Sequence, residues 1–343
     1  MQQRSSWSLR HALGTALWLL AVLGSAHAAD DPDVKARQQA LERAAAAVVG
    51  VQAQAVSQAR SATTLGRSRQ GSGVVIGDDG LVLTIGHLIL EAEQVLLVTD
   101  DERRIPARVV AYDLASGFGL LRALVPLGLA PVALGSAGLL ADDEPLMVVN
   151  GGDDGAVAAT RLVSRRDFSG YWEYHVDGAL FTSPPLAAHS GAGLFNGAGE
   201  LVGIGSLFVA DARGPGAPRL PGNMFVPVDL LRGKLPELLS GGRTRESERA
   251  WLGINCVEVD GRIRVVRVNE DSPADVAGLE VGDTILSIDG LAVATLEKLW
   301  KRLWAGPAAE RAVKLDILRD GRPQSVTVQS VDRAKTLRRA EGV

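Results

Sequence analysis

The fold is decided by the stretch Ala187-Ala188-His189-Ser190-Gly191-Ala192-Gly193-Leu194-Phe195-Asn196-Gly197-Ala198-Gly199-Glu200-Leu201-Val202-Gly203-Ile204-Gly205-Ser206. It places Ser190 in a glycine-rich turn, which is followed by an apolar strand, a Gly-Ala-Gly-Glu turn and a second strand. Such a turn suits acyl transfer, because the serine hydroxyl can attack a carbonyl while backbone N–H groups of the same turn stabilise the oxyanion. A serine between small residues is also a common turn former. A histidine in a suitable earlier setting is therefore needed to support Ser190 as a nucleophile.

A suitable histidine follows a β-hairpin about a hundred residues earlier. Predicted strands at 71–76 and 81–84 flank an Asp79-Gly80 pair, which is typical of a tight hairpin turn. His87 comes directly after the second strand. It is either a helix-capping or turn residue, or the general base that takes the proton of Ser190.

Two segments around this histidine resemble a known family. Gly71-Ser72-Gly73-Val74-Val75-Ile76 and Leu83-Thr84-Ile85-Gly86-His87-Leu88-Ile89 together resemble the opening of the HtrA (high-temperature-requirement) serine proteases. The order of histidine first and serine later also agrees with that family. The resemblance implies a mainly β fold, a trypsin-like double six-stranded β-barrel, with His87 as general base and Ser190 as nucleophile. It further implies an oxyanion hole formed by the N–H groups of Ala188 and Ser190.

The third member of the expected catalytic triad is missing. In the stretch that matches the family's catalytic aspartate, residues 112–121, the matching position is Gly117. In a full triad this carboxylate holds the imidazole in its productive tautomer, and its loss costs about 10⁴ in rate. Asp113 matches a second aspartate of the family, and we expect it to cap the turn into the next strand. A water or a carboxylate from elsewhere can orient His87 instead. Gly117→Asp is expected to raise the rate, provided that the backbone there tolerates a side chain.

The region before Ser190 departs from the family in two ways. The family has glycine where this chain has Ala188, and a Cβ at a position that needs the freedom of glycine costs about 1 kcal/mol and can leave an oxyanion N–H pointing away. Asp177 resembles the aspartate that precedes the nucleophile loop, but it lies about five residues farther from Ser190 than in the family, and the gap contains Pro184-Pro185. The lining of the substrate pocket is therefore expected to differ.

The C-terminal part of the chain resembles a PDZ domain over nearly its whole length. Its most specific motif is the pair of segments 271–279 and 281–290. In a PDZ domain, loop N–H groups bind a free C-terminal carboxylate while the peptide adds as a strand to a sheet edge. Segment 296–304 predicts an apolar-striped helix that walls the peptide groove. The residues with the form of the carboxylate-binding loop are Trp251, Leu252, Gly253 and Ile254. The alternative is that Trp251 and the tryptophans of the helix only fill the core.

The N-terminus predicts export. Arg4 and Arg10 precede an apolar run at 12–23 and the sequence Ser25-Ala26-His27-Ala28, which together are typical of a cleavable signal peptide, residues 1–28. The apolar run is too short for a membrane span. We therefore expect a periplasmic or secreted protein.

Composition limits the chemistry of the exported chain. Cleavage leaves 34 basic and 40 acidic residues, a net charge of −6, which gives no indication of nucleic-acid binding. Cys256 is the only cysteine, so no internal disulfide forms. The remaining histidines are His87, His175 and His189, and we expect structural roles for the last two. So few zinc ligands predict neither a metal site nor a cofactor.

The predicted organisation has six segments. They are a signal peptide (1–28), an N-terminal helical segment (29–45), the trypsin-like protease domain (46–239), a polar linker (240–249), the PDZ domain (250–332) and a C-terminal tail (333–343). Two functions remain open. One is an exported endopeptidase that acts on unfolded or damaged proteins and binds C-terminal peptides at the PDZ groove, as a homo-oligomer, a trimer by the family resemblance. The other is a degenerate protease that binds peptides, or acts as a chaperone-like envelope protein, without cutting.

Overall fold

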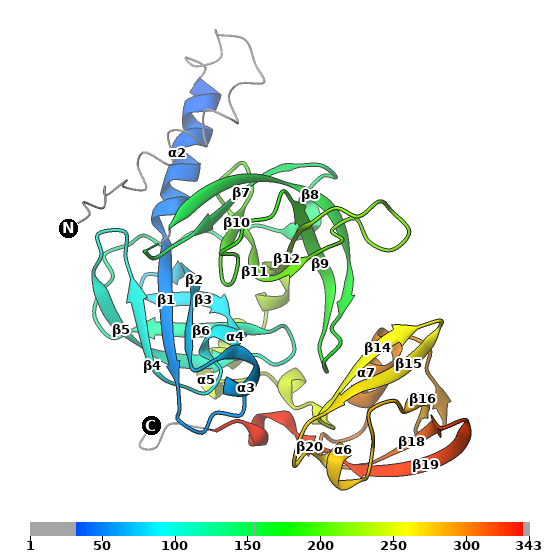
Figure 1. Ribbon diagram of the computed structural model, residues 1–343. Helices are drawn as coiled ribbons and strands as arrows, with labels where there is room; N and C mark the ends of the chain where they lie inside the picture. The colour runs from blue at the N-terminus through cyan, green and yellow to red at the C-terminus, as the bar shows by residue number, and fades with distance from the viewer. Residues whose placement is uncertain (1–31, 154, 339–343) are drawn as a thin grey trace, which may run out of the picture.

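Short strands separated by glycine turns build two closed six-stranded barrels, followed by a smaller sheet domain (Figure 1). The computed structural model describes residues 32–153 and 155–338. The predicted signal peptide, residues 1–28, lies outside the described residues. The predicted mainly β fold with two six-stranded barrels is confirmed.

The first barrel has the strand order β1-β2-β3-β6-β5-β4. Its strands are β1 (Val48–Ala55), β2 (Ser68–Gly77), β3 (Leu81–Ile85), β4 (Ala92–Val98), β5 (Arg104–Tyr112) and β6 (Phe118–Ala123). Helix α2 (Pro32–Ala46) precedes β1, and the short helices α3 (Ala62–Leu65) and α4 (Gly86–Ile89) lie between strands. The predicted hairpin is the antiparallel pair β2–β3, whose turn contains Gly80 with φ +74°. A positive φ suits glycine, and this explains the Asp-Gly pair.

The second barrel has the strand order β10-β11-β12-β9-β8-β7. Its strands are β7 (Pro145–Asn150), β8 (Ala156–Ser169), β9 (His175–Ser183), β10 (Gly193–Phe195), β11 (Leu201–Val209) and β12 (Gly222–Pro227). Beside them lie the 3₁₀ helices η2 (Ala137–Leu139) and η3 (Val228–Leu231), and α5 (Leu235–Gly241). One buried apolar cluster runs through both barrels, from Leu41 of α2 to Leu238 of α5. The two barrels therefore share one core and pack as a single unit.

The third domain has its own core around a five-stranded sheet path, β14-β15-β16-β18-β19. Its strands are β13 (Ala250–Trp251), β14 (Ile254–Val259), β15 (Arg262–Val268), β16 (Thr284–Ile288), β17 (Leu291–Ala292), β18 (Ala312–Arg319), β19 (Arg322–Gln329) and β20 (Val331–Asp332). Its helices are α6 (Pro273–Val276), α7 (Leu296–Trp304) and the 3₁₀ helices η4 (Arg245–Ser247) and η5 (Arg333–Thr336). Helix α7 buries Leu296, Leu299, Trp300 and Leu303, the spacing of an amphipathic helix. The apolar stripe predicted for this helix thus belongs largely to the core.

The predicted linker, residues 240–249, is packed rather than loose. Asp113 is 1% exposed and accepts hydrogen bonds from the hydroxyls of Thr244, at 2.8 Å, and Ser247. It also accepts from the Ser116 N–H at 3.2 Å, which confirms the predicted turn-capping role of Asp113. The carboxylate therefore joins the first barrel to the start of the third domain.

The hairpin formed by β8 and β9 extends from the second barrel toward α7 and β14 of the third domain (Figure 1). Its tip consists of residues 170–174. Aromatic rings gather there: Trp172 stacks on Tyr174 with ring centroids 5.6 Å apart and planes 7° apart. The hairpin tip thus places a cluster of aromatic rings between the barrels and the third domain.

Candidate active site

The junction between the two barrels brings His87 and Ser190 together. Strand β3 leads directly into α4, which carries His87, while Ser190 lies in the turn before β10. The Nε2 atom of His87 lies 3.1 Å from the Oγ of Ser190. This is hydrogen-bond distance between a base and a nucleophilic hydroxyl. The structure therefore brings into contact the two side chains that the sequence singled out.

The Gly-Ser-Gly sequence around Ser72 holds the nucleophile turn against the first barrel. The Ser72 N–H donates to the Ser190 carbonyl at 2.9 Å, and the Ser72 Oγ accepts from the Gly151 N–H at 3.0 Å. A Cβ on Gly71 would lie 2.6 Å from the Ser190 carbonyl oxygen. A Cβ on Gly191, where φ is +75°, would lie 1.9 Å from the Ser72 carbonyl oxygen. Glycine at both positions permits this close approach of the turn.

The turn also leaves two N–H groups available. Among residues 32–153 and 155–338, neither the Ala188 N–H nor the Ser190 N–H has a hydrogen-bond acceptor. Ala188 is not among the residues with positive φ in those ranges, so its Cβ brings no left-handed strain. The strain expected from replacing the family's glycine is therefore absent. Two unpaired N–H groups beside the nucleophile are what an oxyanion hole requires.

The surroundings of His87 favour its neutral form. Burial lowers the pKa of the imidazole to about 4, and His189 and Arg69 act in the same direction. Arg69 donates to the His87 carbonyl at 3.1 Å, so its positive charge is held close to the ring. A neutral imidazole can accept a proton at pH 7, but a base with so low a pKa drives proton transfer weakly.

Gly117 occupies the position of the missing carboxylate, and a tyrosine fills the space beside it. Gly117 has φ +85°, and a Cβ built on it would lie 2.7 Å from the hydroxyl oxygen of Tyr174. That hydroxyl donates to the Ser116 carbonyl at 2.8 Å. In the part of the chain that the structure describes, no carboxylate hydrogen-bonds to the ring of His87, whose recorded partner is Ser190. The proviso attached to Gly117→Asp is thus not met, because neither the backbone nor the space admits a side chain.

Gly117→Asp is accordingly expected to destabilise the protein rather than activate it. A positive φ costs a residue with a Cβ about 1–2 kcal/mol, and displacing a packed ring adds about 1–3 kcal/mol. The urea midpoint should fall, and the labelling rate of Ser190 by a fluorophosphonate should not exceed that of the wild type. Gly216→Asp is the matched control, since Gly216 has φ +82° with nothing within 4 Å of an added Cβ. Faster labelling in a folded Gly117→Asp variant would contradict this expectation.

Asp177 lies in β9, the strand before the nucleophile loop, at the end of the strand that is farther from Ser190. It is exposed near the start of β9 and pairs with Lys301 of α7 at 3.1 Å. Strand β9 continues to Ser183, so the family spacing to Ser190 falls on Thr182 instead. The Thr182 hydroxyl is buried and has no hydrogen-bond partner among the described residues. The longer gap before Ser190 thus leaves Asp177 beside Lys301 of α7 and places Thr182 at the family spacing.

One group of side chains in the described ranges has the spacing of metal ligands. Asp167, His175 and Asp177 place ligand atoms within 4.8 Å of one another. The Lys301 ammonium lies 3.5 Å from Asp167 and 3.1 Å from Asp177, so a positive charge already stands among the carboxylates. His175 is buried and its Nδ1 lies 2.8 Å from the Ser169 Oγ. The cluster therefore fastens the β8–β9 hairpin to α7.

The predicted carboxylate-binding loop already holds a carboxylate from the protease domain. The Leu252 N–H donates to Glu173 Oε1 at 2.7 Å, and the Gly253 N–H donates to the same oxygen at 3.3 Å. Burial raises the pKa of Glu173 to about 7, while Arg333 and the two N–H groups act in the opposite direction. Sequence reasoning missed Glu173. Its only signal was an acidic residue within the aromatic run Tyr171-Trp172-Glu173-Tyr174.

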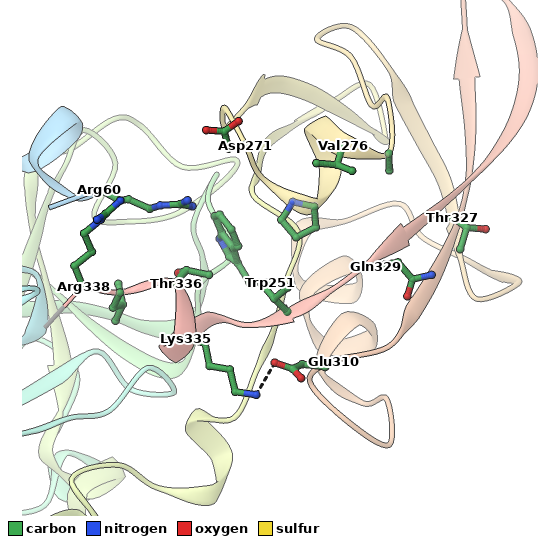
Figure 2. Close-up of a pocket in the computed structure, with 14 residues that line it drawn as sticks. Arg60, Trp251, Asp271, Val276, Glu310, Thr327, Gln329, Lys335, Thr336 and Arg338 are labelled. Atoms are coloured by element: carbon green, nitrogen blue, oxygen red, sulfur yellow. Dashed lines mark hydrogen bonds and ion pairs between the residues drawn. The ribbon is translucent and has the colours of Figure 1, made fainter. Parts of the chain in front are cut away.

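The other two residues of the predicted loop are buried. Ile254 begins β14 and is part of the core of the third domain. Trp251 lines a groove of about 750 Å³ whose walls come from α6, β19, β20 and the C-terminal segment, not from β14 or α7. Figure 2 shows Trp251 in this groove together with Arg60 and Thr336. The Trp251 side chain therefore supports the junction between domains and does not line the peptide groove.

Two family models match the chain. Residues 71–204 match the trypsin-like peptidase domain, and residues 250–329 match the PDZ domain. The first match includes His87, Gly117 and Ser190. The second includes the whole predicted carboxylate-binding loop.

Curated relatives are serine proteases by name. The probable periplasmic serine endoprotease DegP-like of Ectopseudomonas mendocina is 30% identical over 285 residues, which are 77% of this chain and 57% of the relative. The putative serine protease HhoA of Synechocystis is 29% identical, over 76% of this chain and 70% of the relative. The periplasmic pH-dependent serine endoprotease DegQ of Escherichia coli is 29% identical, over 75% and 58%. The chain thus spans little more than half the length of the DegP-like and DegQ relatives.

Solved structures show the same fold. The HtrA-type protease AlgW with a tripeptide has a TM-score of 0.53 and 20% identity, covering 86% of this chain and 96% of that one. The serine endoprotease from Yersinia pestis has a TM-score of 0.52 and 23% identity, covering 86% and 97%. Within the described ranges, helices fall short of the length and apolar character needed to span a bilayer. The chain thus joins a trypsin-like peptidase domain to a PDZ domain, and it is similar to serine endoproteases named DegP-like and DegQ.

Proposed function

We propose that this protein is an HtrA-type serine endopeptidase with Ser190 as nucleophile and His87 as general base. The contact between His87 Nε2 and Ser190 Oγ, at 3.1 Å, carries the proposal. His87 takes the hydroxyl proton as Oγ attacks the peptide carbonyl, and later donates it to the leaving amine. The unpaired N–H groups of Ala188 and Ser190 stabilise the oxyanion. Water then hydrolyses the acyl-enzyme.

The enzyme is expected to be slow. In a full triad, loss of the orienting carboxylate costs about 10⁴ in rate, and here Gly117 supplies none. The pKa of His87, at about 4, weakens the base further. These losses affect one catalytic unit, so they do not simply multiply.

The packing of Tyr174 against Gly117 favours a second function. A tyrosine that closes the carboxylate position makes return to a full triad costly, as expected of a chain that binds peptides without cutting them. In this alternative, the PDZ domain binds peptides and the protease domain does not cleave them. It predicts a folded protein whose Ser190 does not react.

A serine-directed fluorophosphonate distinguishes the two functions. Labelling of the full chain that disappears in Ser190→Ala supports the endopeptidase. Ser240→Ala is the matched control, since its hydroxyl is exposed on α5 and labelling should persist. Absent labelling in a folded wild type favours the peptide binder.

We further propose unfolded or damaged proteins as substrates and the periplasm as the location. The printed names of the DegP-like and DegQ relatives, which call them periplasmic, support the location. The predicted signal peptide, residues 1–28, supports it independently. Peptides with a free C-terminus remain the proposed ligands of the loop Trp251–Ile254.

A further inference from the structure

The tip of the β8–β9 hairpin pairs with the edge strand β14 through one antiparallel bridge. Trp172 forms an antiparallel bridge with Asn255, and the Cys256 N–H donates to the Tyr171 carbonyl at 2.6 Å. An extended segment that adds to a sheet edge in this way is the mode by which PDZ domains hold a peptide. The hairpin tip therefore lies where a bound peptide would lie.

Helix α7 closes the other side of the same segment. The Nε1 of Trp300 donates to the Gly170 carbonyl at 3.0 Å. The ammonium of the next residue of α7, Lys301, pairs with Asp167 and Asp177, which flank the tip on β8 and β9. The main-chain carbonyls of Gly170 and Tyr171 thus accept hydrogen bonds from α7 and β14, respectively. The ion pairs of Lys301 fix the base of the tip to α7.

The Glu173 carboxylate makes the hairpin tip resemble the C-terminus of a bound peptide. Its side chain is 2% exposed, and its carboxylate accepts the N–H groups of Leu252 and Gly253. Those N–H groups belong to the loop that receives a terminal carboxylate in a PDZ domain. The main chain of Glu173 continues into Tyr174, so the side chain supplies the carboxylate that a chain end would otherwise supply.

We propose that the protease domain's own hairpin is the resident ligand of the PDZ groove, with the Glu173 side chain in the place of a C-terminal carboxylate. A peptide with a free C-terminus must then displace residues 170–173 before it can bind. The apparent affinity of the groove for the peptide is then its intrinsic affinity multiplied by the fraction of molecules in which the hairpin is released. The inference rests on one part of the proposed function, namely that the loop Trp251–Ile254 binds a carboxylate.

A crosslink tests the position of the hairpin without reference to activity. Because the Cys256 N–H bonds to Tyr171, Trp172 and Asn255 form a non-hydrogen-bonded antiparallel pair, with Cα atoms about 4.5 Å apart, which suits a disulfide. Trp172→Cys with Asn255→Cys, in a full chain that also carries Cys256→Ala, should oxidise within one molecule. Trp172→Cys with Val259→Cys on the same strand is the matched control and should stay reduced.

The crosslink has two outcomes that would overturn the inference. Thiols that stay reduced in a folded Trp172→Cys/Asn255→Cys protein would show that the hairpin does not occupy the groove. A disulfide that joins two chains on a non-reducing gel would assign the groove to the hairpin of a second copy. An intramolecular disulfide supports the inference.

Peptide binding tests the role of Glu173. The probe is a fluorescein-labelled copy of residues 167–172 with a C-terminal valine, prepared as the free acid and as the amide, and titrated into the full chain. Glu173→Ala should bind the free acid at least about tenfold more tightly than the wild type, because the competing ligand is removed. Glu173→Gln, which keeps a neutral acceptor, should show a smaller increase. Glu270→Ala, which removes an exposed carboxylate of the PDZ domain itself, should match the wild type.

The same titration separates failure of this inference from failure of the proposed PDZ function. An unchanged affinity in a folded Glu173→Ala protein would overturn the inference. Equal affinities of that variant for the free acid and the amide would overturn the carboxylate role of the loop, and with it the role of Glu173. The oxidised Trp172→Cys/Asn255→Cys protein should bind neither form, and reduction should restore binding of the free acid.

Discussion

His87→Ala should slow the reaction of Ser190 by about 10²–10⁴-fold at pH 7.5, because a positioned general base contributes that much. Fluorophosphonate labelling and cleavage of an unfolded protein should fall together. His189→Ala is the matched control. Its ring bonds the Ala187 carbonyl at 2.9 Å and does not contact the nucleophile hydroxyl, so the rate should change little. Full activity in His87→Ala would exclude this residue as the base.

The same base sets the pH profile of the wild type. With a folded pKa of about 4, His87 is neutral across the range from pH 5.5 to 7.5, so the labelling rate should be nearly constant there. An imidazole with the ordinary pKa of about 6.5 would give a rise of about tenfold over the same range. Such a rise in the wild type would contradict the buried, weakly basic setting of His87.

Asp113→Ala should lower the free energy of unfolding by about 3–5 kcal/mol. The substitution removes the acceptor of the Ser116 N–H and hydroxyl and of the Thr244 and Ser247 hydroxyls, of which only one can donate to the other, and each buried group left unpaired costs about 1–3 kcal/mol. Urea denaturation followed by circular dichroism measures the loss. Asp142→Ala is the matched control, since this aspartate is exposed and should change stability little.

The contribution of Asp113 depends on its charge. Burial raises the pKa of this carboxyl, but the hydrogen bonds from Ser116, Ser247 and Thr244 outweigh burial and hold the pKa below its usual value. With the lower pKa in the folded state, the stabilisation is present above the unfolded pKa of about 3.9 and is lost as pH falls through the folded value. The difference between wild type and Asp113→Ala should therefore shrink below about pH 4. An equal difference at pH 3.5 and pH 7 would contradict this linkage.

Local sequence patterns determined much of the catalytic half of the protein. The Asp79-Gly80 hairpin, the glycines around Ser72 and the turn at Ser190 each specify a backbone shape over a few residues. Such shapes depend on the φ that glycine permits and on strand alternation, and both can be read from neighbouring residues. The absence of the triad carboxylate was also evident, because the residue type at position 117 is printed in the sequence. That Tyr174 fills the space beside it was not, because residue 174 reaches Gly117 only when the two barrels fold together.

The sequence by itself determined the two barrels, the PDZ-like third domain and the pairing of His87 with Ser190 through its resemblance to a known family, while local patterns determined the β2–β3 hairpin and the turn at Ser190. The tertiary structure alone decided how the domains are joined. Glu173 meets Leu252 across 79 residues, and Asp113 meets Thr244 across 131 residues. No pattern of neighbouring residues encodes such pairs, since a buried carboxylate is stabilised only where distant donors converge on it and replace the water that it loses.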